Sequence, residues 1–156
     1  MTHNPPLPRC LDAELERQAL GLLLIGDAPP RWLTEQHVPS GWHPVLLRAI
    51  FALRKRNPEQ LLPRTARLLV RKGLLYRREA HNSDRHASHL LSSVDLSEMV
   101  AEALHAQTMG WPLPWDELRE LGERRRMLGV LQRIEIRLRG GDIGTNEARE
   151  ELRSAL

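Results

Sequence analysis

Apolar residues along this chain recur mainly at the spacing of an α-helix. Leu11, Leu15, Ala19 and Leu22 lie three or four residues apart, which places them on one face of a helix over about residues 12–25. Asp12 can cap the start of this helix, and Gly26 can end it. Alternating apolar and polar runs, which are typical of strands, are nearly absent. The pattern therefore predicts an all-α protein.

Further helices follow from the same spacing and from proline and glycine positions. A short helix is expected over residues 30–36, and another from Pro44 to about Arg56 that stops before Pro58. The next is expected over 64–72, then a polar loop over 76–85 and a short helix over 86–92. Asp95 is expected to cap a helix that runs to about Met109. The residues expected to face inward on these helices are Leu46, Ile50, Leu53, Met99, Ala103 and Leu104.

The segment GWPLPW, residues 110–115, interrupts the helical pattern because two prolines and a glycine disfavour a continuous helix. After it come a long helix to about Arg139, a Gly140-Gly141 turn and a last helix from Thr145, which together form an αα-hairpin. We therefore expect a flexible linker over 1–10, a helical bundle over 11–109 and a C-terminal helical hairpin over 110–156.

The long helix has more apolar residues than its short neighbour can cover. Five leucines follow spacings of three and seven, and Met127, Ile134 and Ile136 lie partly off that line. The closing helix offers only a few small or apolar residues in return. Two interpretations remain open at this point: the surplus is buried in the chain's own core, or another protein covers it. The leucines are Leu118, Leu121, Leu128, Leu131 and Leu138.

Charge is unevenly distributed over the 156 residues, although the net charge is only +3. Residues 48–78 contain ten basic side chains and one acid, Glu59, whereas residues 79–156 contain ten arginines and fourteen acids. Arg64, Arg67 and Arg71 share one helix face and are candidate nucleic-acid contacts. A solvated basic face is the alternative interpretation, because no phosphate-binding loop, zinc finger or RNA-binding aromatic motif accompanies them.

Catalytic and metal-binding signals are weak. The cluster HNSDRHASH, residues 81–89, could place His86 and His89 on one helix face, but it lacks the usual spacing of metal ligands. We find no nucleophile beside a base and no pair of carboxylates placed for catalysis, so we expect no enzyme activity, no cofactor and no metal. With one cysteine, Cys10, and no apolar run long enough to span a membrane, we expect a cytoplasmic protein.

The order of these elements resembles a known helical domain. DAELERQALGLLLIGD, GWHPVLLRAIFALRKRN and QLLPRTARLLVRKGLL resemble both the C-terminal helicase-binding domain of bacterial DnaG-type primases and the N-terminal domain of DnaB-type replicative helicases, which share a fold. The tail ELRELGERRRMLGVLQRIEIRLRGGDIGTNEAREELRSAL favours the primase. The resemblance covers about residues 11–156.

This resemblance implies a non-catalytic domain that docks on the hexameric replicative helicase through its terminal hairpin and couples priming to unwinding. The implied partner contacts, carried to this chain, are Ile134, Arg137, Leu138, Arg149, Leu152 and Leu156. Such a domain would be a monomer alone. Two alternatives stay open: the self-associating collar domain of a helicase, and a basic helical DNA-binding domain.

Overall fold

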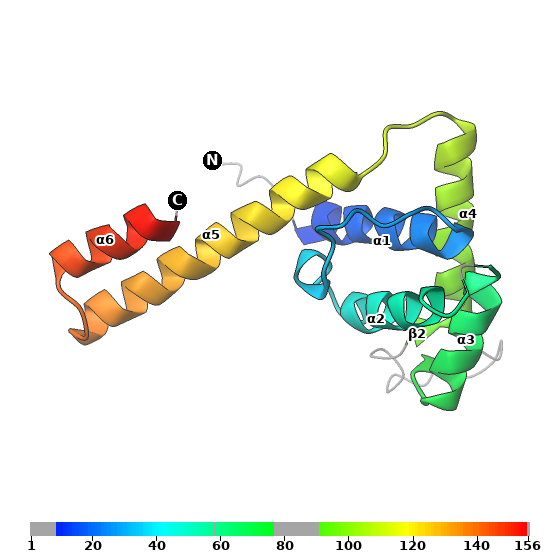
Figure 1. Cartoon of the computed structure of the whole chain (residues 1–156), viewed down its shortest axis with the longest axis horizontal. Coiled ribbons are helices and arrows are strands. Elements are labelled where there is room, and N and C mark those ends of the chain that lie inside the picture. The colour runs from blue at the N-terminus through cyan, green and yellow to red at the C-terminus, as the bar shows by residue number, and fades with distance from the viewer. Residues whose placement is uncertain (1–8, 58, 77–90, 156) are drawn as a thin grey trace, which may run out of the picture. The chain divides into compact units, whose positions relative to one another are not determined.

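The computed structural model describes residues 9–57, 59–76 and 91–155, and within them the fold is all-α, as predicted. Figure 1 shows the helices in chain order. The only strands in the described part are two residues long each, and they pair in parallel, Leu75 with Leu91 and Tyr76 with Ser92. The elements are α1 (Arg9–Ile25), the 3₁₀ helix η1 (Glu35–His37), α2 (His43–Arg54), α3 (Leu61–Arg71), β1 (Leu75–Tyr76), β2 (Leu91–Ser92), α4 (Ser93–Thr108), α5 (Trp115–Gly140) and α6 (Thr145–Ala155).

The chain divides into two compact units, Met1–Leu118 and Arg119–Leu156. The division falls inside α5. Leu118 is fully buried in the core of the first unit, and Trp115 packs against that core. The first turn of α5 therefore belongs to the bundle, whereas the sequence places the start of the hairpin at residue 110.

The core of the first unit is built around α1, which packs against α2, α3 and α4. Residues 19, 20, 22, 23 and 24 are all buried, so α1 is covered on more than the one face that its apolar spacing predicts. Neighbouring helices contribute apolar side chains of similar depth. The largest fully buried apolar side chains of the unit are Leu20, Leu23, Val38, Leu46, Leu47, Ile50, Leu69, Met99 and Leu118.

The crossing of α1 and α4 depends on Gly21. A Cβ atom at this position would lie 2.5 Å from the carbonyl oxygen of Met99 and 3.0 Å from the Cβ of Ala103. The two backbones can approach this closely because glycine has no side chain. A salt bridge between Arg17 and Glu102, 3.4 Å long, joins the same two helices at the surface.

A buried carboxylate joins α1 to the start of α2. Glu16 is fully buried, and its carboxylate accepts hydrogen bonds from the Ser40 backbone N–H at 3.0 Å and the Ser40 hydroxyl at 2.8 Å. It also contacts Nδ1 of the buried His43 at 2.7 Å. Several partners are needed here because burying a charge without them costs several kcal/mol. This cluster positions α2 against α1.

Four details of the sequence prediction are wrong. Residues 30–36 form a turn and then η1 instead of one helix, because Thr34 takes the cap position of η1 after the two prolines. Ser92 caps α4 and Asp95 is its capping-box partner: the Asp95 N–H donates to Ser92 Oγ at 3.0 Å, and the Ser92 N–H donates to Asp95 Oδ2 at 2.9 Å. Leu91 and Ser92 form a strand rather than the end of a helix. Leu104, expected to face inward, is 49% exposed.

Parts of several predictions lie outside the described residues. These are residues 1–8 of the linker predicted over 1–10, most of the loop and helix predicted over 76–92, the histidine cluster over 81–89, and Leu156. The last two residues of that predicted linker are helical, because α1 begins at Arg9 and Asp12 lies in its first turn.

Candidate partner-binding surface and basic face

The second unit is a helical hairpin with a small core of its own. Ile134 of α5, Ile143 of the turn and Ala148 of α6 are buried together, and Val130 and Leu152 pack against them. Figure 1 shows α6 running back along the C-terminal half of α5. The sequence makes this turn possible, since Gly141 has φ +76°, a conformation that side chains disfavour.

Ion pairs add to the contact between the two helices of the hairpin. The guanidinium of Arg137 on α5 pairs with the carboxylate of Glu151 on α6 and lies 3.7 Å from that of Glu147. Arg137 is half-buried, so these pairs are partly shielded from water. They fix α6 on one side of α5 and leave the remaining sides to solvent.

An apolar stripe, interrupted by Glu135, remains exposed on α5 beside the face that α6 covers. Met127, Leu128, Leu131 and Leu138 are 47%, 57%, 46% and 37% exposed. At about 100° per residue their side chains fall within about 100° of one another around the helix. We call these four residues the α5 stripe. A stripe of this width is what a surface helix usually buries.

A second apolar feature lies on the other flank of the hairpin. Ile136 is 69% exposed and borders a hollow of about 410 Å³ between α5 and α6. Acidic and basic side chains stand at its edge, as at the rim of many protein interfaces. The other residues that line it are Val130, Arg133, Ile134, Arg137, Glu151, Ser154 and Ala155.

The predicted partner contacts fall into three groups in the structure. Leu138 and Arg149 are exposed, and Leu138 belongs to the α5 stripe. Ile134 and Leu152 belong to the hairpin core, so they support the surface instead of forming it. Arg137 faces acids of its own hairpin.

Sequence reasoning missed Met127, Leu128 and Leu131 as candidate contacts. The signal for the two leucines was present in their spacing of three and seven residues. Spacing alone does not tell which side of α5 the closing helix covers.

The candidate nucleic-acid residues lie on α3. Arg67 and Arg71 are exposed, and none of the ion pairs found among the described residues involves them. Arg64 instead donates through its guanidinium to the backbone carbonyls of Asn57 and Glu59, at 2.6 Å and 3.4 Å. The three arginines predicted to share a face therefore divide into two exposed cations and one that stabilises the preceding loop.

Ionisable groups elsewhere have structural contacts. The guanidinium of Arg48 hydrogen-bonds both carboxylate oxygens of Glu35, at 2.9 Å and 2.6 Å, and these bonds hold the pKa of Glu35 below its usual range. In the buried cluster, Ser40 and His43 both contact the carboxylate of Glu16. That arrangement, with Glu16 fully buried and His43 almost so, is a structural link between helices and offers no open face to a substrate.

Within the described ranges, no group of three or more acidic, histidine or cysteine side chains is placed to hold a metal ion. In the same ranges no helix is both long enough and apolar enough to cross a membrane. The chain matches no known protein family, no curated protein and no solved structure.

Proposed function

We propose that this chain is a non-catalytic docking domain of a DnaG-type primase that binds the hexameric replicative helicase through its C-terminal hairpin. Such binding would couple priming to unwinding in the cytoplasm. The observation that carries the proposal is the α5 stripe, four large apolar side chains exposed together on one hairpin. Exposed apolar groups gathered in one place are typical of protein-binding sites.

The shape of the second unit supports this role. Its core holds three buried residues, and α6 covers only one side of α5. A helix that presents an apolar stripe can insert it into a groove of a partner, with anchors three, four and seven residues apart. Charged side chains would lie at the rim of the contact. They are Arg149 and the ion pair in which Arg139 Nη2 lies 2.6 Å from Glu135 Oε1.

Isothermal titration calorimetry of the full chain with the replicative helicase hexamer of the same organism tests the proposal. We expect a complex at micromolar concentration or below. The double variant Leu128→Gln, Leu131→Gln keeps helix propensity, because leucine and glutamine are similar helix formers. Each buried leucine contributes about 1.5–3 kcal/mol, so affinity should fall by about 100-fold or more.

A matched control changes two exposed apolar residues of the first unit. Leu104 and Val94 on α4 are 49% and 41% exposed, and their replacement by glutamine should leave the affinity within about twofold. Failure of the wild-type chain to bind the helicase would refute the proposal. Assembly of the chain alone into a ring-sized oligomer in light scattering would instead favour a helicase collar domain.

A further inference from the structure

A second surface, on the first unit, combines an apolar hollow with unpaired positive charge. The hollow measures about 440 Å³, within the range of small-ligand sites. Pro29, Pro30, Leu33 and Phe51 supply its apolar walls. Arg31, Arg54 and Lys55 complete its lining.

The three cationic side chains that line the hollow differ in whether they are already hydrogen-bonded within the protein. The guanidinium of Arg54 donates to the backbone carbonyls of Asp27 and Gly26, at 2.5 Å and 3.3 Å, and so is held at the end of α1. Arg31 and Lys55 are exposed, and no ion pair among the described residues involves them. These two side chains are therefore free to bind anions beside the hollow.

The acids nearest to the hollow in sequence are already engaged. The carboxylate of Asp27 accepts a hydrogen bond from the Gln107 side chain at 3.1 Å. That of Glu35 is held by Arg48. Over residues 48–78 the sequence contains only one acid, Glu59. None of these acids is found in an ion pair with Arg31, Arg54 or Lys55 within the described residues.

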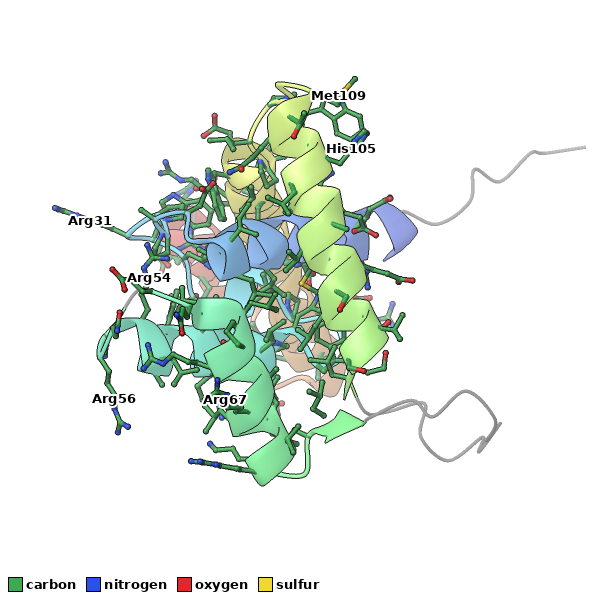
Figure 2. The ribbon with its side chains drawn as sticks, turned by 90° about the vertical axis from the view of Figure 1, so that its right-hand side faces the viewer. Arg31, Arg54, Arg56, Arg67, His105 and Met109 are labelled. Atoms are coloured by element: carbon green, nitrogen blue, oxygen red, sulfur yellow. The ribbon has the colours of Figure 1, made fainter. Side chains whose placement is uncertain are left out.

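Unpaired cations continue beyond the hollow. Figure 2 shows Arg31, Arg54 and Arg56 on the same side of the first unit, with Arg67 on α3 level with Arg56 and nearer the middle of the view. Arg71 and Lys72 are also exposed at the end of α3. We call Arg31, Lys55, Arg56 and Arg67 the basic face. Its residues lie in the loop after α1, just beyond the end of α2 and on α3, a spread that suits a polyanion with regularly repeated charges.

We propose that the basic face binds single-stranded nucleic acid, with one unstacked base in the hollow against Phe51 and the adjoining phosphates on Arg31 and Lys55. Proteins that bind single strands combine a basic track with an aromatic or apolar platform for the bases. A duplex keeps its bases stacked and offers none to such a hollow. The sequence predicted a nucleic-acid contact at Arg64, Arg67 and Arg71. The proposed site differs from it because it is centred near the end of α2 and does not include Arg64.

Fluorescence anisotropy of the full chain with a labelled, mixed-sequence DNA strand of about 12 nucleotides tests this proposal, since single-strand sites span about 4–16 nucleotides. The double variant Arg31→Glu, Lys55→Glu should weaken binding by about tenfold or more. It should also lower the slope of log affinity against log salt by about 1.4, or about 0.7 per lost phosphate contact. Phe51→Leu should weaken single-strand binding and leave duplex binding unchanged.

Two controls separate this site from general charge and from the hairpin. Arg126→Glu with Arg153→Glu makes the same change in net charge on exposed, unpaired arginines of the second unit, and should alter affinity less than the Arg31 and Lys55 pair does. Leu128→Gln with Leu131→Gln should leave nucleic-acid binding intact. The inference is independent of helicase docking, so either can fail alone.

Three results would overturn the proposal. The first is no single-strand binding at about 100 µM, the weak end of non-specific affinity. The second is equal loss of affinity in the two charge-reversal variants. The third is tighter binding of an acidic peptide than of a DNA strand of equal charge, which would show the hollow to be a peptide site.

Discussion

Substitution of Gly21 by alanine provides a direct test of the packing between α1 and α4. The new Cβ would lie 2.5 Å from the Met99 carbonyl oxygen, whereas ordinary contact begins at 3.4 Å. The helices must therefore separate by almost 1 Å, which also loosens contacts on either side. Overpacking of this kind costs about 1–3 kcal/mol, and the rigid backbone oxygen favours the upper end.

Helix propensity opposes this cost, because alanine is about 1 kcal/mol better than glycine inside a helix. We therefore expect Gly21→Ala to lower the free energy of unfolding of the first unit by about 2 kcal/mol. At about 4 °C per kcal/mol for a unit of this size, the melting temperature should fall by about 8 °C. Urea unfolding followed by tryptophan fluorescence is the suitable assay, since all four tryptophans lie in the first unit.

Gly129→Ala is the matched control, because Gly129 also lies within a helix but a Cβ there would meet nothing within 4 Å. The same substitution should then stabilise the second unit by up to about 1 kcal/mol, which far-UV circular dichroism would detect. If the Gly21→Ala variant proved as stable as the wild type, or more stable, the inference that α1 and α4 pack too closely for a side chain at residue 21 would be wrong.

Two further predictions concern polar contacts of the first unit. Glu16→Gln should lower the free energy of unfolding, measured by chemical denaturation, by about 2–3 kcal/mol. The reason is that an uncharged amide cannot accept all the hydrogen bonds that the buried carboxylate makes with Ser40 and His43. Unchanged stability would show that this link between α1 and α2 is dispensable. The hydrogen bonds from Arg48 lower the pKa of the Glu35 carboxyl in the folded state. The pair therefore stabilises the fold at pH values above the pKa of an unfolded glutamate, and this stabilisation is lost as pH falls through the lowered pKa of the folded state. NMR titration of the Glu35 carboxyl should show a low pKa that rises in Arg48→Ala, and a pKa that stays the same would contradict the pairing.

The helices were the most predictable part of this protein. Apolar spacing and the positions of Pro44, Gly73 and Gly141 were sufficient to place α2, α3 and the hairpin within a few residues. These signals are local, because they depend on backbone conformation and on residues one turn apart. The prediction failed over residues 30–36 and at the start of α4, where the side chains of Thr34 and Ser92 decide the cap.

The candidate surfaces were only partly predictable. The sequence showed an apolar surplus on the long helix. It could not distinguish Ile134, which α6 buries, from Leu131, which lies three residues earlier on the same helix and stays exposed. Likewise the excess of basic residues over 48–78 was plain, whereas the hollow that joins Arg31 to Lys55 was not.

What the sequence alone determined is the helical class of the protein, its uneven charge and the presence of more apolar surface than the closing helix can cover. The tertiary structure decided which side of α5 remains open, which arginines are occupied by backbone carbonyls, and that Phe51 and two prolines enclose a hollow beside free cations. The physical reason is that helix periodicity comes from neighbours in the chain, whereas burial and charge pairing come from residues brought together only by folding.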